Sequence, residues 1–317
     1  MTTEFMKSFG LSEDDALLLF NNFLDAELRG KSSHGLIRFC NTLRKFGKFN
    51  NNSLSITSDS ISSTTIKVDG KGMLGIIPIM RACNQLVNMK SNNISMAAVT
   101  NYMGTTGALG YYARYLAKNN LISIILGNAK SSVAPVEGNA PVIGTNPLAI
   151  GLPREKEPII VDFATSAISY GSILLAQNEN CKLPDNSIRK YDGAPSNNPF
   201  DISAGYQLPM AGHKGFALGI AIEVMAGLFI GSKSGNLISG SEGTLIITIK
   251  QDSYISEKTY KEKVRIFSDE VHSIETLNEG DRVRLPGERL ITSINDDEIY
   301  IKDYLYENFY EICKNFI

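Results

Sequence analysis

The amino-acid sequence predicts an α/β fold, with a sheet surrounded by helices. The main observation is the alternation between residues 64 and 126, where short β-like runs are separated by longer segments with helical spacing. The second is size, because 317 residues of which 43% are hydrophobic can bury a substantial core in one large unit or two closely packed domains. The third is that glycine- and threonine-containing segments follow several β-like runs, where open α/β sheets build ligand sites.

The first predicted element is a helix from about Ser12 to Arg29. The acidic residues after Ser12 give a capping-box-like start, apolar residues follow at helical spacing, and Gly30 is placed to end the helix. A second helix can be capped by Ser32 or Ser33. We therefore expect His34 in the first turn of that second helix.

The later elements follow the same two periodicities. Strands are predicted at residues 65–68, 94–99, 121–126, 147–152, 158–163 and 244–249, and helices at 76–89, 107–118, 168–177 and 214–230. The apolar run 216–230 contains Glu223 and is expected to be a buried helix, since it is shorter than the roughly 20 apolar residues of a membrane span. Residues 182–209 carry four prolines and are expected to form a long surface loop. The segment after residue 250 is rich in charged residues and has helical spacing.

Composition limits the classes of partner. A formal net charge of −2 with interspersed charges gives no reason to expect nucleic acid or a membrane, so the expected partner is a small molecule. The four cysteines are far apart and suggest neither a disulfide framework nor a metal site. The N-terminal text has no targeting pattern, and we expect a cytoplasmic protein.

The segment Gly70–Gly75 matches the G-x-G-x-x-G pattern of a Rossmann dinucleotide site. It follows a strand and precedes a helix, which is the required context. However, no Asp or Glu occurs from Gly75 to Val136, so the acidic residue that holds the adenosine ribose is missing. A glycine-rich turn is the preferred interpretation, with a Rossmann dehydrogenase as an alternative.

The segment Ser33-His34-Gly35 with Arg38 carries the strongest chemical hypothesis. His34 and Arg38 are four residues apart and would share one face of a helix. For reduction of a 2-oxo acid, the guanidinium can bind the substrate carboxylate and the imidazole can donate a proton to the carbonyl oxygen. Ser33 can bind the same substrate or only cap the helix. The competing interpretation is that His34 packs locally and Arg38 is a solvated surface charge.

The surroundings of His34 should disfavour its charged form. Both the helix N-terminus and Arg38 destabilise an imidazolium, so we expect a lowered pKa in the free protein. A bound carboxylate would act in the opposite direction. A protonated donor is therefore expected in the substrate complex.

Three further clusters can bind a ligand. Gly212-His213-Lys214-Gly215 opens the apolar helix and offers free amides and an ammonium to an anion, although it can also be a glycine-broken turn. Residues 144–147 and 161–166 lie at the ends of β-like runs, where ordinary turn and capping chemistry is the alternative.

Taken in order, these clusters resemble the malate/L-lactate dehydrogenase family of the non-Rossmann type. The family includes ureidoglycolate, sulfolactate and diketogulonate dehydrogenases and piperideine-2-carboxylate reductases. The likeness runs from about Leu11 to Arg289, and it is carried by seven collinear blocks: Leu28–Gly30 with Ser33–Gly35 and Arg38, Val68–Gly70 with Leu74–Gly75, Val133–Pro135, Gly144–Pro147, Asp162–Ser166, Gly212–Gly215 and Pro286–Arg289.

The resemblance implies a homodimer with a non-Rossmann mixed sheet and surrounding helices. It implies NAD or NADP as cofactor and hydride transfer to a small 2-oxo acid, or to a cyclic imino acid, with a carboxylate-bearing substrate. It also implies that His34 is the proton donor, with Ser33 and Arg38 at the substrate, and that no metal takes part. The residues that match cofactor-binding segments are Asn128, Pro135, Asn146, Asp162, Phe163, Ala164, His213, Lys214, Gly287, Glu288 and Arg289. The corresponding division is a nicotinamide-binding domain at 67–231 and a substrate- and dimer-associated domain at 1–66 with 232–317.

One position departs from the family pattern. Members commonly carry a second acid/base histidine in a segment like Ser-Asn-His-Phe-Gly, and Tyr102 occupies that place in Thr100–Gly104. A phenol with a pKa near 10 is a poor base at neutral pH, which favours an imine or an unusual oxo acid as substrate. Tyr102 is accordingly a fourth candidate catalytic residue. The alternative function is a non-catalytic dimeric relative that binds a nicotinamide or a small carboxylate.

Overall fold

The fold is a seven-stranded mixed sheet with helices on both faces. In the computed structural model, the described residues are 6–7, 10–45, 52–89, 92–238, 242–278, 281–288, 294–295, 298–299 and 303–314. The strand order is β1-β2-β3-β10-β4-β5-β6, with β1 at Thr57–Ser62, β2 at Thr65–Asp69, β3 at Ile94–Tyr102, β10 at Glu242–Lys250, β4 at Leu121–Gly127, β5 at Leu148–Leu152 and β6 at Ile159–Phe163. Only the β2–β3 pair is parallel within this sheet. The predicted α/β class with a mixed sheet is confirmed.

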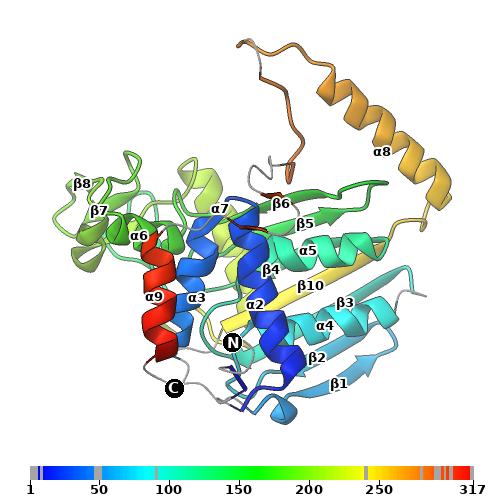
Figure 1. Cartoon of the computed structure of the whole chain (residues 1–317), viewed down its shortest axis with the longest axis horizontal. Helices are drawn as coiled ribbons and strands as arrows, with labels where there is room; N and C mark the ends of the chain where they lie inside the picture. Colours follow the sequence, from blue (N-terminus) through cyan, green and yellow to red (C-terminus); the bar gives the residue numbers. More distant parts are fainter. Residues whose placement is uncertain are drawn as a thin grey trace.

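Two apolar layers cover the sheet (Figure 1). On one face, α4 (Ile76–Asn88) and α5 (Leu109–Lys118) pack on β3, β4 and β10 to form the largest buried cluster, which includes Leu86, Tyr112 and Ile246. On the other face, α7 (His213–Glu223) and a following π-helical turn (Val224–Leu228) pack on β4 and β10 through Ile222 and Ala226. The predicted helices and strands of this region agree with these bounds to within a few residues.

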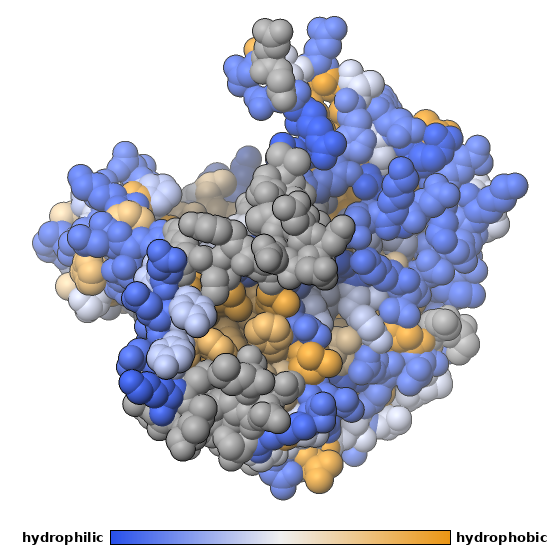
Figure 2. Space-filling view, in the orientation of Figure 1, coloured by the Kyte–Doolittle hydropathy of each residue, from blue (hydrophilic) through white to orange (hydrophobic). Residues whose placement is uncertain are grey.

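The N-terminal helices form a third apolar cluster beside the first. Helix α2 spans Glu13–Leu28, and its N-cap Ser12 accepts a hydrogen bond from the backbone of Asp15 at 3.2 Å, as the capping-box pattern predicted. Helix α3 (Leu36–Leu43) and helix α9 (Asp303–Lys314) complete this cluster, where Phe39 contacts Phe23 and Phe309. Figure 2 shows apolar side chains gathered over α2 on this face, whereas helix α8 is largely hydrophilic.

The segment 182–209 is more ordered than predicted. It contains a three-stranded sheet of β7 (Ile188–Lys190), β8 (Pro195–Ser196) and β9 (Gly205–Gln207), closed by a 3₁₀ helix at Pro199–Ala204 and packed near α6 (Tyr170–Asn178). The prolines end these very short strands rather than exclude them. Short two- and three-residue strands leave almost no period-two signal in the sequence.

The apolar helix is not buried on all sides in a single chain. Its outer face exposes Ile220, Val224, Met225, Leu228 and Phe229, the last at 69% of its surface. The expectation of a buried helix is therefore wrong for this face. Gly219, Ile222 and Glu223 on the inner face are buried as predicted.

The predicted domain boundaries cut across the main sheet. The 66/67 boundary falls inside β2, and β10, which lies beyond residue 231, sits between β3 and β4 at the centre of the sheet. Because β10 pairs along nearly its whole length with both neighbours, this sheet cannot be divided at residue 231.

The segment after β10 extends away from the body as an arm (Figure 1). It consists of helix α8 (Glu257–His272) and a return that brings Pro286 back to β6, where its carbonyl accepts a hydrogen bond from Ile160 N at 2.9 Å. A two-residue hairpin, β11 (Ile294–Asn295) with β12 (Glu298–Ile299), precedes α9. Among the described residues, no helix is long and apolar enough to span a membrane.

The Gly70–Gly75 segment is a packing turn. A Cβ on Gly75 would lie 2.7 Å from Cδ2 of Tyr102, and a Cβ on Gly70 would lie 2.9 Å from Cβ of the same tyrosine. Gly72 has a φ of +77°, which favours glycine. These glycines thus make room for an aromatic ring and a turn, which supports the rejection of a phosphate-binding loop.

Candidate active site

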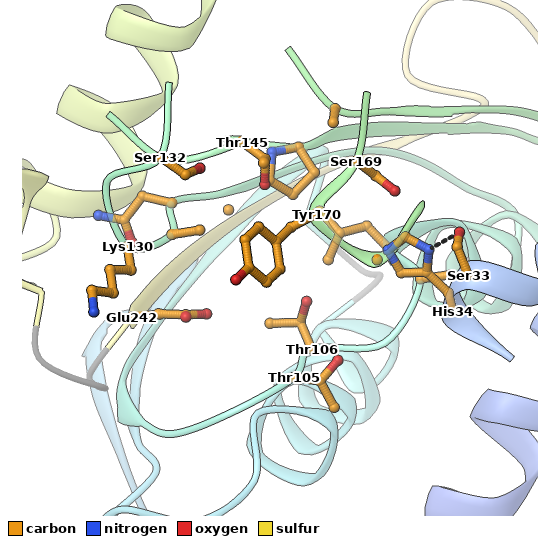
Figure 3. Close-up of a pocket in the computed structure, with 18 of the residues that line it drawn as sticks. Ser33, His34, Thr105, Thr106, Lys130, Ser132, Thr145, Ser169, Tyr170 and Glu242 are labelled. Atoms are coloured by element: carbon orange, nitrogen blue, oxygen red, sulfur yellow. Dashed lines mark hydrogen bonds between the residues drawn. The ribbon is translucent and has the colours of Figure 1, made fainter. Parts of the chain in front are cut away.

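A pocket of about 620 Å³ opens at one edge of the main sheet (Figure 3). The ends of β3, β4 and β6 meet the starts of β5 and β10 at this edge, because these strands are antiparallel to one another. A second pocket of about 340 Å³ adjoins it and shares Lys31, Ala108, Asp162 and Phe163. Together they form one extended cleft between the N-terminal helices and the sheet edge.

His34 enters the pocket from a 3₁₀ turn and not from a helix. The turn spans Ser32–His34, and α3 begins only at Leu36, with Gly35 as its N-cap residue. The carboxylate of Glu27 holds this junction by accepting hydrogen bonds from Leu36 N at 2.9 Å and from Ser32 Oγ at 2.8 Å. The expected position of His34 in the first turn of a helix is therefore wrong. The cap that was predicted at Ser32 or Ser33 is supplied by Glu27, which belongs to the preceding helix α2.

Gly35 is required by this arrangement. A Cβ at position 35 would lie 2.0 Å from Oε2 of Glu27, so any side chain there would displace the capping carboxylate. The Ser-His-Gly order thus fixes the backbone that carries His34. The Ser-His-Gly pattern therefore pointed to the correct turn, although the contact between Gly35 and Glu27 that requires the glycine cannot be seen in the sequence.

The imidazole of His34 is neutral in the free protein. Its pKa is lowered from 6.5 to about 4, mainly by burial, with the Asp162 carboxylate opposing this shift and the Arg38 and Lys31 charges adding to it. The direction agrees with the prediction, although burial is the main cause. Ser33 Oγ lies 3.0 Å from His34 Nδ1, so a hydroxyl that donates to Nδ1 leaves Nε2–H as a donor.

Arg38 lines the same pocket with a guanidinium that forms no ion pair with any described residue. Burial lowers its pKa, and the charges of Glu242 and Tyr170 act in the opposite direction. A largely desolvated guanidinium without a carboxylate partner is costly, and a planar anion would satisfy it bidentately. Arg38 is therefore the best site in the pocket for a ligand carboxylate.

Lys31 and Asp162 form an ion pair on the wall shared by the two pockets. The pair joins the turn before His34 to the end of β6, and Lys31 Nζ also donates to the Asp162 backbone carbonyl at 3.5 Å. Asp162 was predicted from its place at a strand end, and Lys31 was not predicted at all. Its only sequence signal was its position beside the Ser-Ser-His turn.

Two predicted cofactor residues, Asn128 and Asn146, hold a buried carboxylate. Glu223 accepts hydrogen bonds from Asn128 Nδ2 at 3.1 Å, Asn146 Nδ2 at 2.7 Å and Gly235 N at 2.8 Å. Asn128 also lines the large pocket, whereas Asn146 is fully buried. This network ties the loops after β4 and before β5 to α7 and so fixes the pocket floor.

The other predicted cofactor residues are divided. Phe163 and Ala164 line the large pocket, and Gly287 lines the adjoining one. Glu288 instead accepts hydrogen bonds from Arg154 at 2.6 Å and from the backbone of Leu285 at 3.0 Å, and its carboxylate lies 2.7 Å from His272 Nε2, so it anchors the arm. The residues that line neither pocket are Pro135, His213, Lys214 and Glu288. Arg289 lies outside the described residues.

Tyr102 does not reach the pocket. Its side chain is fully buried in the main core, its hydroxyl lies 2.7 Å from Thr244 Oγ1, and burial raises its pKa well above the ordinary value. The cause is a β-bulge, since Val99 pairs with Thr244 but Tyr102 pairs with Glu242, which leaves one extra residue on β3. The extra residue turns Tyr102 to the same side as Val99. The predicted catalytic role of Tyr102 is corrected accordingly.

Three pocket residues had no clear signal in the sequence. Tyr170 at the start of α6 places its ring across the middle of the pocket, and Lys130 and Glu242 lie on the far side from His34 (Figure 3). The loop residues Thr105, Thr106, Ser132 and Thr145 add hydroxyl groups to the lining. These residues come from five separate segments, and only the sheet topology brings them together.

The cleft fits an extended nicotinamide dinucleotide. Its two joined pockets are of the size that cofactors and small ligands occupy in proteins. Hydroxyl and amide donors line the large pocket, and the cations Lys31, Arg29 and Arg114 line the smaller one. The described residues include no group of His, Cys, Asp or Glu side chains that could hold a metal ion.

The fold and the pocket define a class of α/β protein with an arginine and a histidine in one pocket and without a Rossmann phosphate loop. A sequence model of the family described as malate/L-lactate dehydrogenase matches residues 1–298. The chain belongs to this family. The family model describes dehydrogenases, so the chain is an oxidoreductase.

Three relatives illustrate the family. The L-sulfolactate dehydrogenase of Methanocaldococcus jannaschii is 31% identical over 97% of this chain and 92% of its own length. A sulfolactate dehydrogenase structure from that organism superposes with a TM-score of 0.85 over 99% of this chain and 94% of its own, at 30% identity. The NAD(+)-dependent ureidoglycolate dehydrogenase of Escherichia coli O157:H7 is 26% identical over 95% of this chain and 93% of its own. A Delta(1)-pyrroline-2-carboxylate reductase of Agrobacterium fabrum is 32% identical over 63% of this chain and 59% of its own.

These comparisons confirm the predicted family, the mixed-sheet fold and the class of enzyme. All three relatives are named as dehydrogenases or reductases. The alternative of a non-catalytic binding protein receives no support from them.

Proposed function

We propose that this chain reduces a small 2-oxo acid, or the related cyclic imino acid, and that Arg38 binds the substrate carboxylate. The unpaired guanidinium of Arg38 in the pocket that also holds His34 carries this proposal. A carboxylate bound there would place the neighbouring C2 atom of the substrate within the same small space as the imidazole. The names of the relatives, which act on hydroxy acids and on a cyclic imine, support the same substrate class.

His34 acts as the proton donor in this proposal. In the free protein its lowered pKa keeps the imidazole neutral, and Ser33 fixes which nitrogen carries the hydrogen. A substrate carboxylate on Arg38 offsets one of the charges that lower the pKa of His34, so the pKa of the imidazole is higher in the complex than in the free protein. The proton goes to the carbonyl oxygen as C2 is reduced, and the product is a 2-hydroxy acid.

The bound reduced nicotinamide supplies the hydride. Asp162, Phe163, Ala164 and Asn128 line the large pocket and Gly287 lines the adjoining one, so we assign the cofactor to this shared cleft. The Lys31–Asp162 ion pair stands at the junction, so the Lys31 ammonium is already paired with a carboxylate and competes less with Arg38 for the substrate. Arg38 is then available to the substrate carboxylate, since it forms no ion pair within the part of the chain that the structure describes.

The test is loss of nicotinamide absorbance with a panel of 2-oxo acids and cyclic imino acids. We expect turnover by the wild type, a rise in KM of at least ten-fold for Arg38→Lys, and a larger loss of kcat/KM for Arg38→Ala, because lysine cannot make the bidentate contact. Arg44→Lys, on the outer part of the same N-terminal unit and absent from the pocket, is the matched control. An inactive wild type, or equal effects at positions 38 and 44, would refute the proposal.

We also propose that the protein works as a homodimer. The exposed apolar face of α7 and its π-helical turn is larger than isolated surface residues explain, and α8 stands away from the body. A second copy that covers both features would bury them in a symmetric interface. Sedimentation should give a dimer for the wild type and a monomer for Leu228→Glu with Phe229→Glu, and a monomeric wild type would contradict this.

We place the enzyme in the cytoplasm. Cys83 is a buried thiol whose pKa burial raises, and Cys181 is exposed without a disulfide partner. An exposed thiol persists in a reducing compartment. Fractionation of cells that express the tagged protein would test this placement.

A further inference from the structure

Glu242 is a further ionisable group in the large pocket, and the reaction proposed above does not use it. It is the first residue of β10, it lines the pocket, and it forms no hydrogen bond or ion pair with the part of the chain that the structure describes. Arg38, which lines the same pocket, is likewise without an ion-pair partner there. The two side chains line one space and form no ion pair with each other.

The β-bulge explains why a carboxyl group stands at this place. Thr244, two residues along β10, is fully buried and meets Tyr102 in the core, whereas Glu242 pairs with Tyr102 at the very end of the ladder. The apolar core therefore ends at the Tyr102–Thr244 contact, and the pocket begins at Glu242. The bulge lies on β3 and directs Tyr102 into the core, away from this carboxyl group.

The surroundings make this carboxyl sensitive to the charge of a ligand. Burial raises the pKa of Glu242 to about 8, and the Arg38 charge only partly opposes this effect. Lys130 lies on the same side of the pocket but is exposed and forms no ion pair with Glu242, and Tyr170 lies between this side and His34 (Figure 3). A second carboxylate or a sulfonate placed here would meet a carboxyl group that has no cation in contact with it.

We propose that Glu242 determines substrate specificity by accepting a hydrogen bond from an N–H group at the end of the substrate remote from Arg38. This inference rests on the proposed function, because it assumes that Arg38 holds the substrate carboxylate. The substrate class is then a 2-oxo acid or imino acid with an amide, ureido, amino or ring N–H group. A substrate with a second acidic group is disfavoured.

A matched pair of substrates tests the inference. 2-Oxosuccinate and its 4-amide, 2-oxosuccinamate, have the same length and differ in whether the remote group is a carboxylate or an N–H donor. At pH 9, where Glu242 is ionised, we expect the wild type to prefer the amide by at least 30-fold in kcat/KM, and Glu242→Gln to reduce this preference at least ten-fold, since the carboxamide carries no charge that repels the second carboxylate. Glu155→Gln, an exposed position outside both pockets, removes the same charge and should keep the wild-type preference.

Each result decides the matter. A wild-type preference for 2-oxosuccinate, or equal preferences in the Glu242 and Glu155 variants, overturns the role of Glu242. Loss of the preference in Lys130→Ala but not in Glu242→Gln also overturns it and assigns the remote end to Lys130. Pyruvate, which has no polar remote group, separates this failure from failure of the proposed function: turnover of pyruvate without discrimination rejects only Glu242, whereas no turnover of any 2-oxo acid rejects both. The wild-type preference is measurable even if a variant does not fold.

Discussion

The hydroxyl groups of Tyr102 and Thr244 lie 2.7 Å apart in the core between β3 and β10. The tyrosine ring fills the space that Gly70 and Gly75 leave open, and the bulge at the end of β3, where Asn101 has a φ of +54°, turns the ring away from the pocket. The residue that replaces an expected histidine thus belongs to the core. The motif places Tyr102 where the family has a catalytic histidine, but the extra residue on β3 turns its side chain into the core.

Tyr102→Phe should therefore affect stability and not turnover. We expect kcat/KM to remain within about three-fold of the wild type, because the ring stays in place and no pocket atom is lost. The free energy of unfolding should fall by about 1 kcal/mol through loss of the hydrogen bond to Thr244. Steady-state kinetics and urea unfolding measure the two effects. A hundred-fold loss of activity with unchanged unfolding would return Tyr102 to the catalytic residues.

Gly75→Ala should destabilise the same region. The added Cβ would lie 2.7 Å from Tyr102 Cδ2 and 2.9 Å from Cε2, and a ring fixed by its hydroxyl cannot move away easily. Overpacking of this kind costs about 1–3 kcal/mol. Gly127→Ala is the control for unfolding, because its nearest neighbour would be 3.6 Å from the new Cβ. Equal melting temperatures for the two variants would show that the ring yields.

Much of the fold could be predicted because its elements have strong periodicity. Helix α2 has a capping serine and an apolar stripe, and β3, β4 and β10 are long apolar runs, so local sequence defines them. Strand β1 was not predicted, because all six of its residues are exposed and, among the described strands, it pairs with β2 alone. The position of β10 between β3 and β4 depends on contacts more than a hundred residues apart, which periodicity does not encode.

The site was predictable where its residues are close in the chain. Ser33, His34 and Arg38 lie within six positions, and their spacing left a shared role open until the resemblance to the family favoured it. Glu242 and Tyr170 reach the same pocket from strands and helices far along the chain, and neither belongs to a motif. The role of Glu27 under Gly35 is also non-local. Residues of this kind can be recognised only from the folded structure, in which the ends of several strands meet at one edge of the sheet.

His34→Ala should remove most turnover and leave cofactor affinity largely intact. Loss of a proton donor costs about 10²–10⁴-fold in kcat for a 2-oxo acid, whereas His34 is on the substrate side of the Lys31–Asp162 pair and should change nicotinamide Kd by less than about three-fold. An imine that is already protonated should show a smaller loss. Ser33→Ala, which removes only the partner of Nδ1, should lose about ten-fold. Kinetics and calorimetric cofactor titration test this, and parallel loss of kcat and cofactor affinity would exclude the assigned role.

The pH dependence of stability offers an independent measurement on Glu242. Its pKa is raised from 4.5 to about 8 in the folded protein, so the folded state holds this proton over a range where the unfolded state has released it. The stabilising contribution is fully present below pH 4.5 and is lost as the pH rises through 8. His34, whose pKa is lowered from 6.5 to about 4, acts with the opposite sign but only below about pH 6.5, so the window from pH 7 to 9 isolates Glu242. Thermal melting should show the wild type losing stability relative to Glu242→Gln across that window, and parallel curves for the two proteins would mean that the Glu242 carboxyl is already ionised at pH 7.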